Sequence, residues 1–368
     1  MRIASFNVEN LFSRARALNQ ETWAEGREVL AAYSRLNTRL QKPIYSNADK
    51  KAILADLAQL ALNRSDESTF ARLRQNRGKL IKRPPNAPPQ IMAAGRGDWI
   101  GWIELKTEAV NEVATRMTAK VIQDVNADVL AVVEAEDRIA LKRFNDQLLK
   151  EINATYDCIM LIDGNDDRGI DVGLMTKSDI DIGAVVSHVD DSVDGDRIFS
   201  RDCPEFTIRV DEERLLILVN HFKSKGFGTP AVSNARRKAQ AARVREIYEL
   251  RKSEGVDSIA VVGDLNDTPE SNPLSPLVGD GSDLRDITEH SRFESDGRPG
   301  TFANGTASNK IDYVLLSPAL FDRVTAGGIW RKGVWGGVNG TLFPHYDEME
   351  RAAHAASDHA AIWADIDL

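Results

Sequence analysis

Several polar residues of this chain stand where an apolar run ends, the position from which a folded sheet presents side chains to a substrate. In VVGDLND, Asp264 and Asn266 are two residues apart, so a strand would point both to the same side. A carboxylate and an amide in this relation can hold a cation, a phosphate oxygen or an attacking water. The same pair also suits a turn with Asx hydrogen bonds, and the motif alone leaves both interpretations open.

A second group lies near the C-terminus, in the segment SDHAAIW. Asp358 and His359 are adjacent there, and at a turn from loop to strand both can reach one pocket. Taken singly, SDH would also suit a surface cap. Asp312 is an acid within the apolar run KIDYVLL, and a buried carboxylate needs a partner. We predict that this partner is His359, whose tautomer and protonated form the carboxylate would stabilise.

His221 ends the run LLILVNH and is followed by FKSKG, so that Lys223 and Lys225 lie close to it in sequence. An imidazole at a strand end can donate to a phosphate oxygen or to a leaving oxygen, and the lysines would supply local positive charge. We therefore expect this segment to contact a phosphate group.

Glu134 ends the run VLAVVEAE and is the carboxylate that we expect to bind a cation. A hard cation such as Mg²⁺ takes few protein carboxylates and keeps water and phosphate in its other positions. This preference suits one firmly bound cation held by Glu134 and Asp358 with the assistance of Asn7.

Strands and helices must position these residues. Short apolar, β-branched runs predict strands at residues 3–8, 128–136, 171–176, 215–221, 258–266 and 310–317. Most of them stop at a polar residue, which places functional side chains at the ends of rigid strands. Apolar residues at helical spacing predict a helix over 107–127, directly before the strand of Glu134, and a second helix over 233–255.

Residues 14 to about 90 interrupt this pattern. Segments 50–63 and 70–82 have helical character and are followed by the Pro-rich stretch 83–90 and by a short strand or hairpin at 97–105. We expect one catalytic domain over residues 1–368 with a mostly helical insertion at 14–90. The insertion would be a substrate-selecting cap or a packing elaboration. The basic cluster within 72–83 favours a role that faces phosphate.

Composition limits the possible partners. The chain contains 47 Lys and Arg against 56 Asp and Glu, a formal charge of -9, so it sets up no global attraction for a polyanion. A nucleic acid substrate would need local positive charge or bound cations.

Cys158 and Cys203 fit neither a thiolate metal site nor a disulfide framework. No signal peptide and no apolar run of about 18 residues is visible, so we expect a cytoplasmic protein without a membrane or protein partner.

Taken in order, the motifs resemble those of the endonuclease/exonuclease/phosphatase superfamily. The resemblance implies an α+β fold, a four-layered α/β/β/α sandwich of two mainly antiparallel sheets with the active site at one end. It also implies that Mg²⁺ or Mn²⁺ is bound, and that a water is oriented and deprotonated beside a phosphate group. The motifs are FNVEN at Asn7, the strand-end Glu134, RGIDVGLM at 168–175, NHFKSKG at His221, GDLND at Asp264, KIDYVLL at Asp312 and SDH at 357–359.

The resemblance assigns a role to each group of residues. Asn7, Glu134 and Asp358 would hold the cation. Asp264 with Asn266 would orient and deprotonate the water. His221 and the pair formed by Asp312 and His359 would bind and stabilise the phosphoryl transition state.

Two positions depart from the superfamily pattern. Val133 stands where many relatives have a Gln before the metal-binding Glu, which weakens the expected support of the cation. Arg168 stands where several nucleases have a Tyr that contacts phosphate, and its charge would serve the same purpose. The tract NHFKSKG looks like that of bacterial nucleases of the superfamily.

We therefore predict a metal-dependent phosphodiesterase, most simply a nuclease that acts on DNA or RNA. An alternative is a phosphodiesterase or phosphatase of a small molecule or lipid headgroup, which the net charge of -9 and a cleft narrowed by the insertion would favour. A binding protein on an inactive scaffold is a third possibility, but none of the expected catalytic residues is missing.

Overall fold

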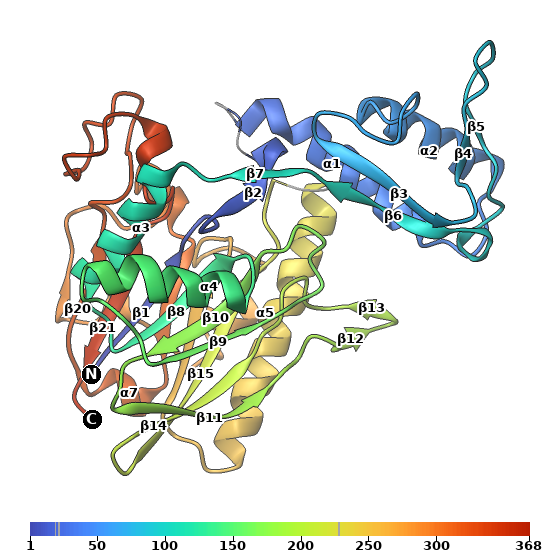
Figure 1. The fold of residues 1–368 in the computed structure, drawn as a ribbon. Helices are drawn as coiled ribbons and strands as arrows, with labels where there is room; N and C mark the ends of the chain where they lie inside the picture. The colour runs from blue at the N-terminus through green and yellow to red at the C-terminus, as the bar shows by residue number, and fades with distance from the viewer. Residues whose placement is uncertain (19, 21–22, 227–228) are drawn as a thin grey trace. The chain divides into compact units, whose positions relative to one another are not determined.

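The computed structural model describes residues 1–18, 20, 23–226 and 229–368 (Figure 1). The chain divides into two compact units. Unit 1 contains residues 1–12, 110–225 and 230–368, and unit 2 consists mainly of residues 13–109. All the residues that we expected to take part in chemistry belong to unit 1.

Unit 1 contains two mixed sheets in which most neighbouring strands are antiparallel. In the first sheet β1 pairs with β8 in parallel and with β21 in antiparallel orientation. The strand order of this sheet is β18 (Phe293–Glu294), β20 (Val324–Trp330), β21 (Ala361–Ile366), β1 (Arg2–Asn7), β8 (Val129–Ala135), β10 (Asp171–Thr176) and β9 (Cys158–Ile162).

The second sheet holds the other strands predicted from apolar runs. Its central pair, β15 and β16, is parallel, and its remaining pairs are antiparallel. The strand order is β11 (Ile180–Val186), β14 (Glu205–Val210), β15 (Glu213–His221), β16 (Ile259–Asp264), β19 (Asp312–Leu316) and β17 (Arg285–Asp286).

The two sheets pack face to face, with helices on the outer faces (Figure 1). Ile3, Val133, Val219 and Val262 belong to the apolar layer between the sheets. Outside the first sheet lie α3 (Glu112–Val125) and α4 (Arg138–Phe144), and outside the second lie α5 (Pro230–Ser253) and the short α6 (Ser275–Val278). This arrangement confirms the predicted four-layered sandwich. It also explains why β8 and β16 read as continuous apolar runs, since both of their faces are covered.

Unit 2 has its own apolar core, which includes Leu36, Leu57 and Trp99. Its helix α2 begins with a capping box in which Ser46 and Asp49 satisfy each other's backbone groups. The elements of unit 2 are α1 (Trp23–Leu40) and α2 (Asn47–Gln59) with three antiparallel pairs, β2 (Ser13–Ala15) with β7 (Thr107–Ala109), β3 (Ala71–Arg77) with β6 (Ile100–Leu105), and β4 (Ile81–Lys82) with β5 (Gln90–Ile91).

The prediction of a helix over 70–82 is wrong, because this segment contains β3. Ala71 and Leu73 point into the core of unit 2, whereas Arg72 and Arg74 lie on the other face and pair with Glu67 and Glu104. This alternation has the period of a strand. Unit 2 also extends past residue 90, since β6 and β7 return to pair with β3 and β2.

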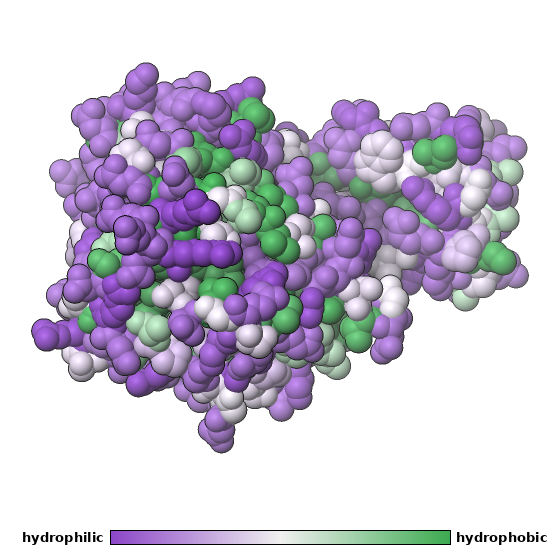
Figure 2. Space-filling model, turned by 90° about the horizontal axis from the view of Figure 1, so that it is seen from below, coloured by the Kyte–Doolittle hydropathy of each residue, from purple (hydrophilic) through white to green (hydrophobic). Residues whose placement is uncertain are grey.

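Hydrophilic residues cover most of the face shown in Figure 2, and apolar residues appear on it in small groups. None of the helices in the described part of the chain is long and apolar enough to span a bilayer.

Candidate active site

Neighbouring strands of the second sheet bring three titratable side chains to one end of the sandwich. In the parallel pair β15 and β16, His221 lies opposite Asp264. In the antiparallel pair β16 and β19, Asp264 lies opposite Asp312. All three residues are buried. Each of these residues stands at the end or the start of an apolar run, and the register of the three strands places these positions next to one another.

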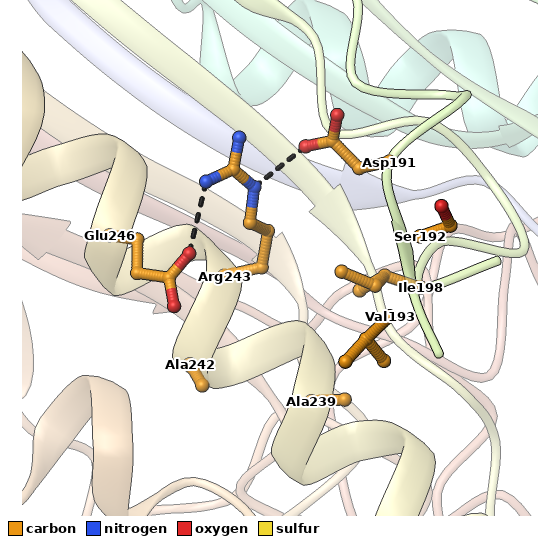
Figure 3. A pocket seen from close by; sticks show the side chains of 8 residues that line it. All are labelled: Asp191, Ser192, Val193, Ile198, Ala239, Ala242, Arg243 and Glu246. Atoms are coloured by element: carbon orange, nitrogen blue, oxygen red, sulfur yellow. Dashed lines mark hydrogen bonds and ion pairs between the residues drawn. The ribbon is translucent and has the colours of Figure 1, made fainter. Parts of the chain in front are cut away.

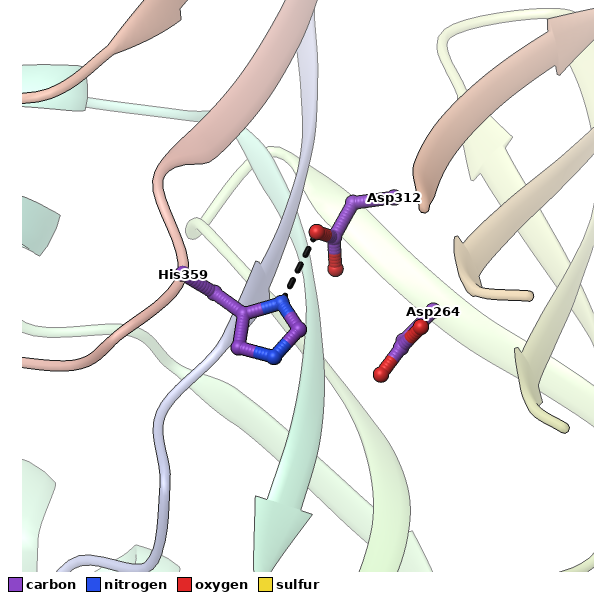
Figure 4. Close-up of side chains that lie close together, drawn as sticks. All are labelled: Asp264, Asp312 and His359. Carbon is purple, nitrogen blue, oxygen red and sulfur yellow. Dashed lines mark hydrogen bonds and ion pairs between the residues drawn. The ribbon is translucent and has the colours of Figure 1, made fainter. Parts of the chain in front are cut away.

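Asp312 and His359 form the predicted pair. Nδ1 of His359 lies 2.8 Å from Oδ2 of Asp312 (Figure 4). The hydroxyl of Thr301 donates to the same carboxylate oxygen at 2.6 Å. The ring of Phe302 packs against the imidazole with centroids 4.9 Å apart. Oδ1 of Asp312 is buried and has no hydrogen-bond partner among the described residues. The carboxylate thus holds the imidazole and keeps one acceptor atom available.

The carboxylate of Asp264 is surrounded by amide donors. Its Oδ1 accepts the backbone N–H of Asn266 at 2.8 Å, and its Oδ2 accepts Nδ2 of Asn266 at 3.0 Å and Nδ2 of Asn7 at 3.3 Å. We predicted that Asp264 and Asn266 lie together because a strand would alternate. They do lie together, but through an Asx turn in which Asn266 has a φ of 54°.

Asn7 and Glu134 lie side by side because β1 and β8 are parallel. Asn7 is opposite Val133, and the backbone N–H of Asn10 donates to the carbonyl of Glu134 at 2.9 Å. On the other side of β1, the hydroxyl of Ser357 donates to the carbonyl of Asn7 at 2.7 Å. Ser357 directly precedes Asp358, so the three expected cation ligands come from adjacent segments of the first sheet.

Several residues at this end of the sandwich have a strained backbone. Glu9, Asn10, Glu134 and Asn266 all have positive φ, between 50° and 67°. Asn adopts this conformation more readily than Glu, for which it costs free energy on the order of 1 kcal/mol or more. Such strain persists where the surrounding structure fixes it, and it is concentrated at functional sites. In β8 it coincides with a bulge, because Asp171 and Val172 of β10 pair with Ala135 and Val133 and leave Glu134 as the extra residue.

The donor atoms of the site suit a hard divalent cation. Asp264, Asp312 and His359 form a group whose potential ligand atoms all lie within 4.8 Å of one another, and in this group His359 could bind a cation only after losing its second ring proton. The unpartnered Oδ1 of Asp312 and the carboxylates of Glu134 and Asp358 add oxygen donors, which Mg²⁺ and Mn²⁺ prefer. Glu134 and Asp358 stand outside this compact group of three in the described structure. The ligand set of Asn7, Glu134 and Asp358 stays a prediction.

Sequence reasoning missed Arg201. It lies in the segment SRDCPEF before β14, and its side chain is completely buried. Nη2 donates to Nε2 of His221 at 3.0 Å, whereas Nε and Nη1 have no hydrogen-bond partner among the described residues. Nε lies 3.5 Å from the carboxylate of Asp166, which also binds Arg168 through two nitrogens. No motif pointed to Arg201, and β14, the strand that follows it, was not predicted either.

Arg168, Lys223 and Lys225 have different environments. Arg168 is largely buried and belongs to the ion-paired chain from Arg168 through Asp166 and Arg201 to His221. Burial, together with the charges of Arg168 and Arg201, lowers the pKa of Lys223 to about 8. Nζ of Lys225 forms an ion pair with Asp267 at 2.6 Å, and the structure does not bring it to the other predicted site residues.

The two histidines of the site differ in charge. Burial lowers the pKa of His221 well below its usual value, and the charges of Arg201 and Arg168 act in the same direction. Burial would also lower the pKa of His359, but the charge and hydrogen bond of Asp312 outweigh it and raise this pKa well above its usual value. Burial and the charge of Asp312 raise the pKa of Asp264. The arrangement thus offers a neutral imidazole, an imidazolium and a carboxylate with an increased affinity for protons.

A separate hollow of about 330 Å³ lies between α5 and the short hairpin of β12 (Ser192–Val193) and β13 (Asp196–Arg197) (Figure 3). The guanidinium of Arg243 there pairs with Asp191 at 2.7 Å and with Glu246 at 3.0 Å. The charged groups of this hollow thus bind each other, and none of its lining residues belongs to the predicted site.

Comparisons with known proteins support the fold and identify the family. A model of the endonuclease/exonuclease/phosphatase family matches residues 90–322. No curated protein sequence matches. A solved structure of a protein of this family from Bacteroides thetaiotaomicron is 17% identical, with a TM-score of 0.50 over 70% of this chain and 90% of that one.

Two further solved structures have the same fold. The mannosyl-6-phosphatase Bt3783 of Bacteroides thetaiotaomicron is 18% identical, with a TM-score of 0.51 over 70% of this chain and 92% of that one. The human Nocturnin catalytic domain is 13% identical, with a TM-score of 0.50 over 71% of this chain and 88% of that one. At these identities the structural likeness shows the fold alone. The family model spans well over half of the chain, and the chain therefore belongs to the endonuclease/exonuclease/phosphatase family.

Proposed function

We propose that this protein is a nuclease that hydrolyses phosphodiester bonds of DNA or RNA with Mg²⁺ or Mn²⁺. Members of its family are phosphoester hydrolases. The observation that carries the proposal is the position of the Asp264 carboxylate, which shares one compact group with Asp312 and His359 and also accepts hydrogen bonds from two Asn amides. In this proposal Asp264 is the general base, His359 is the proton donor, and the two amides orient the carboxylate of the base.

In the proposed reaction Asp264 takes a proton from the attacking water. Asn7 and Asn266 hold its carboxylate in a fixed orientation, so little reorganisation is needed when the water is deprotonated. Its raised pKa makes it a stronger base than an exposed Asp. His359, kept protonated by Asp312, donates to an oxygen of the phosphoryl group on which negative charge develops.

The cation would be held by Asn7, Glu134 and Asp358, and when bound it would stabilise the developing charge of the phosphoryl group. Arg201, Arg168 and Lys223 bring further positive charge to the same end of the sandwich. Charge-assisted hydrogen bonds from guanidinium groups to phosphate are stronger than neutral ones, so Nε and Nη1 of Arg201, which form no hydrogen bond among the described residues, support a phosphate-binding role.

A panel of polynucleotides tests this proposal. Single-stranded, double-stranded and abasic DNA and RNA are incubated with Mg²⁺, Mn²⁺ or EDTA, next to the small diester bis-nitrophenyl phosphate. We expect cation-dependent cleavage of a polynucleotide by the wild type, and a loss of about two orders of magnitude for His221→Ala. Asp264→Asn should cost about four orders of magnitude, since it removes both general base assistance and water positioning. Intact polynucleotides under all cation conditions would contradict the nuclease proposal.

A second candidate is a phosphodiesterase or phosphatase of a small molecule or lipid headgroup. Residues outside 13–109 contain 30 Lys and Arg against 46 Asp and Glu, a net charge of -16, which repels a polyanion. One protein that shares the fold is named as a mannosyl-6-phosphatase. Cleavage of the small diester without cleavage of any polynucleotide would favour this candidate.

A further inference from the structure

The strand pair β3 and β6 of unit 2 has one face that is not used by its core. Opposite residues of an antiparallel pair lie on the same face. The paired residues Arg72 and Glu104, Arg74 and Trp102, and Arg77 and Ile100 therefore share a face, which we call the β3–β6 face. The alternating residues Leu73 and Ile103 are buried in the core of unit 2.

The β3–β6 face exposes large apolar side chains. Trp102 is 45% exposed and Ile100 is 41% exposed. Exposing an indole to water costs free energy, so an exposed Trp next to an exposed Ile on one face of a strand pair indicates a contact surface. The planar ring lies opposite Arg74, whose guanidinium pairs with Glu104 on the same face.

Basic side chains without an ion pair among the described residues lie on β3 and on the segment that follows it. Arg77, Lys79 and Lys82 are exposed, and none of them has an ion pair in the described part of the chain. The charge of the whole segment agrees with this local pattern. Residues 13–109 contain 17 Lys and Arg against 10 Asp and Glu, a net charge of +7, in a protein whose total is -9. Unit 2 is thus the part of the chain that attracts a polyanion.

We propose that the β3–β6 face binds single-stranded nucleic acid, with a base stacked on Trp102 and phosphates neutralised by Arg77, Lys79 and Lys82. Aromatic rings bind unpaired bases because every base has a flat face, and basic residues next to the ring follow the backbone. A duplex keeps its bases stacked on each other and offers Trp102 no such surface. This inference rests on the proposed nuclease function, and it assigns substrate capture to a surface built by unit 2.

Binding is measured separately from hydrolysis. Fluorescence anisotropy of a labelled single-stranded DNA and of its duplex is recorded with the full-length protein in EDTA, at low and moderate salt. The variants are Trp102→Ala and the triple variant Arg77→Glu, Lys79→Glu, Lys82→Glu. A matched control, Lys51→Glu, Arg143→Glu, Lys150→Glu, changes three other exposed cations and gives the same net charge. Hydrolysis of bis-nitrophenyl phosphate with Mg²⁺ or Mn²⁺ monitors the active site in every variant.

We expect the triple variant to bind the single strand at least tenfold more weakly and to flatten the salt dependence by about two units of slope. Trp102→Ala should weaken binding of the single strand about tenfold and leave the salt slope nearly unchanged. The control should lose less than threefold, and all variants should hydrolyse the small diester at rates within twofold of the wild type.

Other outcomes would overturn the inference. Equal losses in the triple variant and the control would mean that only net charge matters. Unchanged binding of the single strand by Trp102→Ala, or equal losses for strand and duplex, would remove the stacking role. A wild type that cleaves the small diester but binds no single strand would refute the binding surface, whereas absent hydrolysis of every substrate would refute the proposed function instead.

Discussion

The guanidinium of Arg201 donates to Nε2 of His221, and both groups are buried at one end of the second sheet. Because Nε2 accepts this hydrogen bond, the ring carries its proton on Nδ1. The same Nε2 lies 3.4 Å from Oε1 of Glu134 and 3.6 Å from Oδ2 of Asp264. Arg201 therefore places a permanent positive charge next to two carboxylates and fixes the orientation of the imidazole.

Replacing Arg201 tests whether this charge acts on the phosphoryl group. Arg201→Met keeps most of the apolar volume, two of the three nitrogens that it removes form no hydrogen bond in the described structure, and Asp166 keeps its ion pair with Arg168, so folding should be retained. We expect a fall of two to three orders of magnitude in kcat, on the scale of losing one donor that stabilises a transition state. Arg214→Met, which changes an exposed Arg of β15, is the control. Thermal unfolding checks the fold, and turnover within threefold of the wild type would exclude the role.

Asp312 and His359 should behave as one unit in a double-mutant cycle. Asp312 orients the imidazole and stabilises its charged form, so losing either residue removes the same function. We expect Asp312→Asn and His359→Ala each to lower kcat/KM by about two orders of magnitude, and the double variant to lose little more than the worse single variant. Steady-state kinetics on the small diester measure the four proteins. Fully multiplicative losses would show that the two residues act independently.

Local patterns predicted much of this fold and most of its site. The run at 171–176 coincides with β10, the helix predicted over 107–127 contains α3, and the one predicted over 233–255 overlaps all but the first three residues of α5, because each pattern repeats within a few residues. The pair of Asp312 and His359 was also predictable, since a buried acid needs a partner. Arg201 was not, because its contact with His221 depends on how a loop closes over the sheet, and no periodic pattern encodes this closure.

The segment 70–82 shows a different reason for failure. The spacing of its apolar and basic residues is compatible with a helix and with a strand. The strand forms because β3 pairs with β6. The strained backbone of Glu134, with a φ of 66°, was equally unpredictable, since Glu134 is the extra residue of a bulge that forms only when β8 pairs with β10.

Glu134→Gln should change the requirement for cations more than the chemistry. An amide keeps the shape of the side chain but removes the negative charge that attracts Mg²⁺ or Mn²⁺. We expect the cation concentration for half-maximal activity to rise ten- to hundredfold, with kcat largely recovered at saturation. Calorimetric titration with Mn²⁺ measures binding without substrate.

The control variant is Glu108→Gln in unit 2. Glu136→Gln is not suitable, because the carboxylate of Glu136 accepts hydrogen bonds from the backbone N–H groups of Leu11 and Phe12. Unchanged Mn²⁺ affinity would remove Glu134 from the ligand set.

His188 should make stability depend on pH at a place away from the active site. Its Nε2 lies 2.9 Å from Glu205 and its Nδ1 lies 3.0 Å from Asp191, while Arg251 and Arg243 bind the same two carboxylates. Burial would lower the pKa of His188, but these carboxylates outweigh it and raise the pKa above 6.5.

Because the pKa of His188 is higher in the folded than in the unfolded protein, its contribution to stability is complete below the unfolded-state pKa. This contribution is lost as the pH rises through the folded-state pKa. We therefore expect His188→Gln to lower the free energy of unfolding by about 1–3 kcal/mol at pH 5.5 and by less at pH 8.5. Urea denaturation at the two pH values measures this difference, and an equal effect at both would show that the imidazole contributes through packing rather than charge.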